Sequence, residues 1–327
     1  MSRLLPVGVI GVGALGRHHA RHLAQLDGAC LVGVTDTDRD RARAVAAELG
    51  TEACDLEALL DRVEAVTIAV PTPAHAEVGL HALERGIPVL MEKPLASTLA
   101  EADQLIAAAA ATGVQLQVGH IERFNPAVRE LKRCIERGDM GEIVSVFARR
   151  VGVMPPQVKD ANVILDLAIH DIDVFRYLLG ADSPTEVFCN AGRVNGGDLL
   201  DYADVFLRFG RVACLLQVNW VTPVKIRELA VTGTRGYAEV EYVRQELRYH
   251  SAQAVRPVDS YSEVTAYSEQ APELLAHEHV EPLARELGEF LRAVEGRPAE
   301  IVSGEEGKRS MEIALQLVER AELVESG

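Results

Sequence analysis

The chain has 327 residues, of which 48% are hydrophobic, and this length predicts two domains rather than a single core. Its formal net charge of −16 argues against a nucleic-acid or anionic-membrane surface, although a small ligand that carries phosphate is compatible with it. The five cysteines are scattered without a C-x-x-C pair, and no run reaches the roughly 18 apolar residues of a membrane helix, so we expect a cytoplasmic protein.

Residues 1–121 alternate apolar runs with alanine-rich helical segments. The apolar runs are 4–10, 30–36, 64–70, 87–93 and 114–119. Helical patterns cover 38–49 and 98–112, and Thr98 with Glu101 forms a capping-box pattern at the start of the second. Because the runs are continuously apolar, their strands are predicted to be buried on both faces, as in a parallel sheet covered by helices. The prediction is an α/β Rossmann domain with a doubly wound sheet.

Residues 122–327 follow a different pattern. Strands are predicted in near-unbroken succession at 184–194, 202–209, 212–221, 226–232 and 237–243. Helices are predicted at 126–137, 162–179, 282–295 and 304–323. Strands joined by short turns favour a mostly antiparallel sheet, so this half is predicted to be an α+β domain. The polar stretch 251–280 shows no pattern and is predicted to be a long loop.

The sequence Gly11-Val12-Gly13-Ala14-Leu15-Gly16 follows an apolar run and opens a helix, in the order typical of a dinucleotide-binding turn. Gly11 permits the tight turn, and Gly13 lets a pyrophosphate approach the helix N-terminus. Asp36 ends the next strand, where a carboxylate accepts hydrogen bonds from the adenosine ribose and repels a 2′-phosphate. These features predict NAD, with Arg39 as the one nearby feature that suits NADP. The predicted cofactor contacts of this region are Gly11, Gly13, Ala14, Leu15, Gly16, Asp36 and Arg39.

Two prolines and a threonine follow the run 64–70, in the sequence Pro71-Thr72-Pro73-Ala74-His75. Open α/β sheets bind ligands at the carboxyl edge of their strands. Pro71, Thr72 and His75 are therefore predicted to line the cofactor cleft. The alternative is that the prolines only stiffen a turn between a strand and a helix.

The run 87–93 ends in Glu92-Lys93-Pro94, so an apolar strand delivers a charged pair to its tip. Neighbouring side chains of a strand point to opposite faces, which separates Glu92 from Lys93. Lys93 lies at the same edge as the glycine turn, so it is predicted to reach the nicotinamide end of the cofactor, with Glu92 also at the cofactor. A solvated lysine paired with a surface acid is the alternative. Pro94 is expected to fix the backbone, and a cis peptide bond is one way to do so.

Asp166, His170 and Asp173 are spaced i, i+4, i+7 in an otherwise apolar helical segment, so they form a polar stripe. The stripe either faces water or belongs to a site; no further ligand cluster supports a metal, and none is predicted. Hydride transfer needs a base with a pKa near neutrality and a cation beside the developing alkoxide. His170 and Lys93 are the right types, and Asp166 lies one turn away to orient the imidazole.

The stretches GVGALGRHHARHL, MEKP and DLAIHDID together resemble the Gfo/Idh/MocA family of NAD(P)-dependent sugar and inositol dehydrogenases, over essentially the whole chain. The resemblance implies a substrate-binding second domain with an open sheet, through which the chains form a homodimer or homotetramer. It also implies that Lys93, Asp166 and His170 are the catalytic groups. One departure is at 162–164, where Asn-Val-Ile replaces a glycine run, which weakens the transfer of substrate contacts from polyol-oxidising members.

Within the family, residues 119–127 and 219–227 resemble the branch that oxidises the C3 hydroxyl of a nucleotide sugar, UDP-N-acetylglucosamine. This resemblance implies coupling to a PLP-dependent aminotransferase, which places an amino group on the resulting ketone. The substrate contacts that it suggests are Lys93, Arg123, Asn125, His170, Trp220 and Lys225. Arg123, Lys225 and also Arg227 suit a diphosphate, and the side-chain amide of Asn125 suits sugar hydroxyls. The indole of Trp220 stacks on a ring or, alternatively, anchors the sheet core.

Other substrates of the same reaction type stay open, namely a free hexose, inositol or a UDP-N-acetylhexosaminuronate. A uronate needs an extra cation for its carboxylate, which Arg149 or Arg150 would supply. A non-catalytic NAD-binding regulator is the alternative from another class, and it predicts loss of the lysine or the histidine. Both Lys93 and His170 are present, so the predicted function is NAD-dependent oxidation of a sugar hydroxyl to a ketone.

Overall fold

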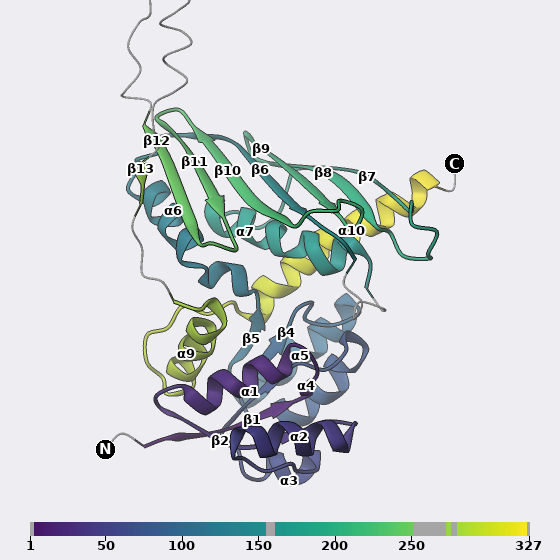
Figure 1. Cartoon of the computed structure of the whole chain (residues 1–327), viewed down its shortest axis with the longest axis vertical. Coiled ribbons are helices and arrows are strands. Elements are labelled where there is room, and N and C mark those ends of the chain that lie inside the picture. The colour runs from purple at the N-terminus through teal and green to yellow at the C-terminus, as the bar shows by residue number, and fades with distance from the viewer. Residues whose placement is uncertain (1–2, 155–160, 252–272, 276–279, 326–327) are drawn as a thin grey trace, which may run out of the picture. The chain divides into compact units, whose positions relative to one another are not determined.

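The computed structural model describes residues 3–154, 161–251, 273–275 and 280–325, with side chains as far as residue 321. The chain forms two compact units (Figure 1). The first comprises Met1–Ile121 and Glu281–Met311, and the second comprises Glu122–Val280 and Glu312–Gly327. Most of the predicted loop 251–280 lies outside the described residues.

Five parallel strands form the sheet of the first unit, in the order β2-β1-β3-β4-β5. Their bounds are β1 Leu5–Ile10, β2 Ala29–Thr35, β3 Ala65–Ile68, β4 Val89–Glu92 and β5 Leu116–Gly119. The chain leaves β1 toward β2 on one side and returns to β3 on the other. The doubly wound sheet predicted from the five apolar runs is therefore confirmed, with its switch point at the carboxyl end of β1.

Helices connect these strands. Their bounds are α1 Gly16–Gln25, α2 Arg39–Leu49, α3 Leu56–Leu60, α4 His75–Leu83 and α5 Leu99–Thr112. The predicted capping box of α5 is present, because the Thr98 hydroxyl accepts from the Glu101 amide and the Glu101 carboxylate accepts from the Thr98 amide. Gly113 ends α5 in the left-handed conformation.

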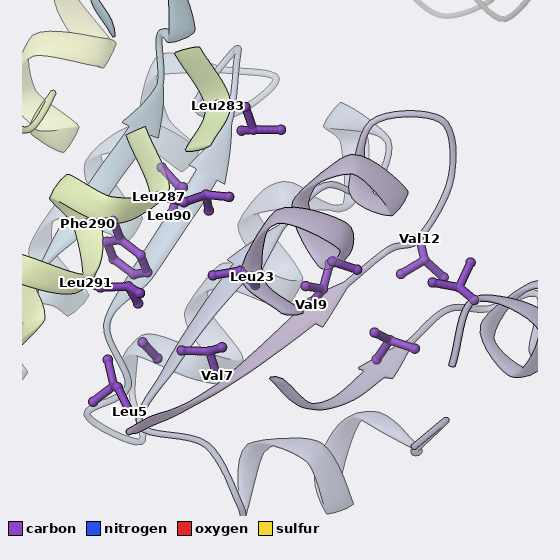
Figure 2. Close-up of a cluster of buried hydrophobic side chains, with 14 of the residues drawn as sticks. Leu5, Val7, Val9, Val12, Leu23, Leu90, Leu283, Leu287, Phe290 and Leu291 are labelled. Carbon is purple, nitrogen blue, oxygen red and sulfur yellow. The ribbon is translucent and has the colours of Figure 1, made fainter. Parts of the chain in front are cut away.

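One helix from the C-terminal part of the chain, α9 (Pro282–Val294), belongs to the first unit, although residues 122–327 were predicted as the second domain. Its apolar side chains lie in one buried cluster with residues of the first unit (Figure 2). From α9 these are Leu283, Leu287, Phe290 and Leu291, and from the sheet they include Leu5, Val7 and Leu90. Helical periodicity predicts that a face is buried, but it does not say against which sheet.

Eight strands form the sheet of the second unit, in the order β13-β12-β11-β10-β6-β9-β8-β7. Their bounds are β6 Ile143–Val151, β7 Glu186–Gly192, β8 Tyr202–Phe209, β9 Val212–Asn219, β10 Ile226–Gly233, β11 Gly236–Glu241, β12 Glu246–Ser251 and β13 Glu273–Leu274. All neighbours are antiparallel except β6 and β9, which confirms the mostly antiparallel sheet. The sequence pattern missed β6, whose apolar residues are interrupted by Arg149 and Arg150.

Helices cover one face of this sheet (Figure 1). They are α6 Pro126–Glu136, α7 Ile169–Leu179 and, from Glu312 on, α10 Gly304–Glu325. The opposite face, called the open face below, carries an apolar row across four paired strands, made up of Phe188, Phe206, Leu215 and Phe147. Phe188 is 65% exposed and Phe147 is 42% exposed. Among the helices that the structure describes, none combines the length and apolar character needed to cross a bilayer.

Candidate active site

Glycines shape the turn between β1 and α1. Gly11 has a φ of +83°, where a side chain is strained and would press against the Ala69 carbonyl oxygen. An added Cβ at Gly13, by contrast, would have nothing within 4 Å. The backbone is thus open at the helix N-terminus, as the approach of a pyrophosphate requires. A hollow of about 290 Å³ adjoins this turn, and Ala14 and Arg41 are among the residues that border it.

The Asp36 carboxylate is held beside the glycine turn. It accepts hydrogen bonds from the amides of Val12 at 2.9 Å and Asp38 at 2.8 Å. Arg41 forms a fork on it, with Nε 3.1 Å from Oδ2 and Nη2 2.9 Å from Oδ1. Burial by itself raises the pKa of Asp36, but the hydrogen bonds from Arg41 and the two amides lower it below its ordinary value. The group is therefore an anion at neutral pH, as binding of ribose hydroxyls requires.

Arg41, rather than the predicted Arg39, is the arginine that contacts Asp36. The predicted residue, Arg39, is exposed and has its Nη2 3.4 Å from Asp55 instead. Asp38 begins α2 by accepting from the Arg41 amide, so residue 41 lies in the first turn of the helix, within reach of the strand end. This capping pattern was the available signal.

We expect Asp36→Ala to weaken NAD binding about 10-fold to 100-fold, since hydrogen bonds to a charged group are worth about 1.5–3 kcal/mol. The change also releases Arg41 near the 2′-position of the ribose, so the affinity for NADP should rise relative to the affinity for NAD. Calorimetric titration with both dinucleotides measures the two affinities. Asp40→Ala is the matched control, because Asp40 is exposed and its carboxylate lies 3.0 Å from Nη1 of Arg43, away from Asp36. An unchanged NAD affinity in Asp36→Ala would remove Asp36 from the cofactor site.

The turn after β3 places its three predicted cofactor residues in different environments. Pro71 is exposed and Thr72 is half-buried at the start of a short 3-10 helix, Thr72–Ala74. His75 is only 1% exposed, and its ring nitrogens face two main-chain carbonyl oxygens. The prediction that His75 lines the cofactor cleft therefore does not match the structure, in which the fold encloses the ring. Pro71 and Thr72 stay candidates.

Lys93 follows β4 at the carboxyl edge of the sheet, the edge that also carries Gly11 and Asp36. The Lys93–Pro94 peptide bond is cis. Glu92 was predicted to contact the cofactor, but its Oε1 lies 2.9 Å from Nε2 of the buried His19. The two charged side chains of the tip thus have separate roles, and Lys93 is the one that remains a candidate for chemistry.

In the second unit, Asp166 and His170 are half-buried on a helical segment whose residues are otherwise mostly buried. Their spacing of four residues places them close together on that segment. Asp173 does not extend the pair into a stripe, since it is 1% exposed and accepts two hydrogen bonds from Arg123. In the described ranges, no group of His, Cys, Asp and Glu side chains is arranged to hold a metal ion.

Asn162 starts this helical segment. Its side chain accepts from the amides of Ile164 at 3.0 Å and Leu165 at 3.1 Å. The first turn is a π-helix, Ile164–Ala168, and α7 continues from Ile169. π-turns are frequent at functional sites because they widen the helix and redirect side chains. Asp166 lies within this turn.

Arg123 was predicted to meet a diphosphate, but it forms a buried ion pair. Its Nε and Nη2 each lie 2.7 Å from an oxygen of Asp173. The guanidinium also lies over the ring of Tyr177, 5.4 Å from its centroid. The contact joins the short 3-10 turn that precedes α6 to α7 within the second unit, so the role of Arg123 departs from the prediction and is structural.

We expect Arg123→Met to lower the free energy of unfolding by about 3–5 kcal/mol, because it leaves the Asp173 carboxylate buried without this partner. The matched control is Arg133→Met on α6. Arg133 is exposed and lies 3.0 Å from Glu130, and such surface pairs contribute about 0–1 kcal/mol. Denaturant unfolding of both variants measures the difference, and equal losses would contradict the assignment.

Two other predicted substrate residues are also buried. Asn125 caps α6 by accepting from the Ala127 amide at 3.1 Å, and it donates to the Tyr242 carbonyl at 3.0 Å. Trp220 is 4% exposed, which agrees with the alternative of a core anchor rather than a ring platform. Lys225 is exposed in the connection between β9 and β10 and stays a candidate for the diphosphate.

Taken together, the doubly wound sheet, the open glycine turn and the anionic Asp36 define an NAD-binding dehydrogenase domain. Comparison with known families agrees: "Oxidoreductase family, NAD-binding Rossmann fold" matches residues 5–120, and "GFO/IDH/MocA C-terminal domain" matches residues 128–239. The chain belongs to the Gfo/Idh/MocA family and is an NAD-dependent oxidoreductase.

Two relatives differ in how much of this chain they match: one matches nearly all of it, and the other matches about two thirds. UDP-N-acetylglucosamine 3-dehydrogenase of Acidithiobacillus ferrooxidans is 33% identical over 314 residues, which cover 95% of each chain. A solved structure of that enzyme superimposes with a TM-score of 0.86 at 31% identity, over 98% of each chain. The NAD-dependent scyllo-inositol 2-dehydrogenase of Bacillus subtilis is 36% identical, over 63% of this chain and 62% of the relative.

Proposed function

We propose that the protein oxidises the C3 hydroxyl of UDP-N-acetylglucosamine to a ketone in the cytoplasm, with NAD as cofactor. The observation that carries this proposal is the extent of the similarity. The relative with that activity matches 95% of the chain, whereas the scyllo-inositol dehydrogenase matches 63%. The ketone then serves a PLP-dependent aminotransferase, which converts it into a 3-amino sugar.

Each site residue has its own task in the proposed reaction. Asp36 accepts hydrogen bonds from the ribose, and the amides at the start of α1 face the pyrophosphate. NAD, when bound there, would supply the acceptor for the hydride that leaves the sugar carbon.

His170 removes the hydroxyl proton, Asp166 orients its ring, and Lys93 hydrogen-bonds the reacting oxygen and stabilises its developing negative charge. Lys93 belongs to the first unit, while Asp166 and His170 belong to the second.

The two arginines considered for a uronate carboxylate are occupied by protein carboxylates. Arg150 is buried, with Nε 2.6 Å from Asp171 and Nη1 2.9 Å from Glu122. Burial lowers its pKa, but these two acids raise it well above the ordinary value, so the ion pairs are stable at all physiological pH values. Arg149 lies 2.6 Å from Glu228. This arrangement favours the neutral N-acetyl sugar over the uronate.

The test is NADH formation, followed by absorbance, with UDP-N-acetylglucosamine, the corresponding uronate, myo-inositol and a free hexose in separate reactions. Because ketone formation is uphill, each reaction is repeated with a PLP-dependent aminotransferase and glutamate to remove the product. We expect NADH only with UDP-N-acetylglucosamine. Turnover of myo-inositol or the uronate in preference would assign the protein to another branch of the family.

The open face of the second unit is proposed to join the chains into a homodimer or homotetramer. The side chains of its apolar row are neighbours on adjacent strands. A contiguous exposed apolar patch of this kind, unlike scattered apolar residues, is typical of an interface. We expect the double variant Phe147→Asp, Phe188→Asp to weaken association about 30-fold or more, since central aromatic contacts are worth about 2 kcal/mol. Sedimentation velocity over a concentration series measures this. Leu4→Asp, at an exposed leucine of the first unit, is the control. An unchanged oligomer in the double variant would show that the interface lies on another surface.

A further inference from the structure

Two buried histidines of the first unit contact the chain immediately before and after Lys93. The first is His19, in the opening turns of α1, which is 1% exposed. Its Nε2 lies 2.9 Å from Oε1 of Glu92, and Oε2 of that carboxylate accepts from the Lys93 amide at 3.1 Å. His19 is thus linked to the backbone of Lys93 through one carboxylate.

The fold makes room for this carboxylate and keeps it ionised. Glu92 pairs with Gly119 on the next strand, and a Cβ at Gly119 would lie 3.3 Å from Oε2 of Glu92. Burial raises the pKa of Glu92, but His19 and Lys93 lower it below its ordinary value. The anion therefore persists at neutral pH, and charge-assisted hydrogen bonds of this kind are the stronger ones.

The second histidine, His75, is the first residue of α4 and is also 1% exposed. Its Nδ1 lies 2.9 Å from the carbonyl oxygen of Pro94, and its Nε2 lies 3.0 Å from that of Val70. Burial lowers its pKa, so the ring is neutral at pH 7 and donates through one nitrogen. Either contact ties α4 to a carbonyl at the carboxyl edge of the sheet, and the Pro94 contact is directly adjacent to Lys93.

We propose that His19 and His75 are positioning residues that hold the backbone on both sides of Lys93. His19 acts through the carboxylate of Glu92, and His75 acts through the carbonyl of Pro94. Both belong to helices that start at the cofactor-binding edge of the sheet, so the place of the lysine is set relative to the cofactor. This inference rests on the catalytic role of Lys93 in the proposed function. A displacement of about 1 Å in such a group costs about 100-fold in rate.

Amide side chains distinguish the two ring nitrogens. Glutamine places its NH₂ close to the position of Nε2, and asparagine close to that of Nδ1. We expect His19→Asn to lower kcat about 10-fold to 100-fold, and His19→Gln to recover most of that loss, with the Kd for NAD within 2-fold in both. For His75 the order reverses: His75→Gln lowers kcat, and His75→Asn recovers it by donating to Pro94.

The control for the helix itself is His18→Asn, since His18 is exposed on α1. Thermal unfolding of each variant identifies any loss of fold. A general packing role predicts equal losses for Asn and Gln at each position, and that result would overturn the inference. Recovery by His75→Gln rather than His75→Asn would overturn the Pro94 half of it.

A spectroscopic measurement tests the positions without a sugar substrate. The chain has five lysines, so reductive methylation with ¹³C gives few signals, and Lys93→Met identifies the one from Lys93. We expect His19→Asn and His75→Gln to shift the Lys93 signal and to leave the other lysines in place. An unmoved Lys93 signal in both variants would overturn the inference. Full turnover in Lys93→Met would instead overturn the catalytic role of Lys93 within the proposed function, while the spectra still report on the two histidines.

Discussion

Lys93→Met should lower kcat for sugar oxidation about 10²-fold to 10⁴-fold, with the Kd for NAD changed by less than about 3-fold. Methionine keeps most of the volume of lysine but cannot donate a hydrogen bond to the reacting oxygen. The negative charge that develops there then loses its cation. Steady-state kinetics with UDP-N-acetylglucosamine and calorimetry with NAD separate the two quantities.

The matched control is Lys308→Met. Lys308 lies 2.6 Å from Asp103 in the first unit, and removal of one surface ion pair costs about 0–1 kcal/mol of stability without touching the site. Its kcat should stay within 2-fold of the unsubstituted protein. If Lys93→Met also stayed within a few-fold, Lys93 would be a structural lysine and another donor would have to stabilise the oxygen.

His170→Asn should lower kcat by a similar factor of about 10²–10⁴, because a positioned general base contributes that much. The pH dependence gives the sharper result. A histidine base works when it is neutral, so the rate of the unsubstituted protein should fall as the pH drops and the imidazole takes up a proton. This fall at low pH is the acidic limb of the pH–rate profile. In His170→Asn the remaining rate should no longer show it.

His250→Asn is the control for a histidine change in the same unit. His250 lies on β12 with its ring 5.8 Å from that of Tyr237, and the acidic limb should persist in this variant. An acidic limb that survived in His170→Asn would show that a different group removes the proton. Asp166→Asn should then be compared, since it would be the next acid–base group on the helix.

Much of the fold followed from patterns that act over a few residues. Continuous apolar runs predicted the five parallel strands, and Thr98 with Glu101 predicted the start of α5, because a capping box involves only neighbours in sequence. The cis bond at Pro94, considered from the sequence, is present. The glycine turn was predictable for the same reason: its spacing reflects the backbone geometry of one tight turn.

The uses of individual polar side chains were less predictable. Arg123 and Asn125 have the right chemistry for a nucleotide sugar, yet one pairs with Asp173, 50 positions away, and the other binds the Tyr242 carbonyl, 117 positions away. The contact of His19 with Glu92 has no local signal in the sequence, and for the contact of Arg41 with Asp36 the cap at Asp38 was the one local signal. The residue type determines which bonds a side chain can make, but not which partner the fold places beside it.

By itself, then, the sequence determined the Rossmann sheet, the cofactor turn and the identities of Lys93, Asp166 and His170 as the chemical groups to test. Only the tertiary structure decided that α9 packs in the first unit, that Asp173 is removed from the polar stripe, and that two histidines flank the lysine. The physical reason is range. Periodicity, capping and turn geometry depend on neighbours along the chain, whereas burial and pairing depend on which distant segments the packed core brings together.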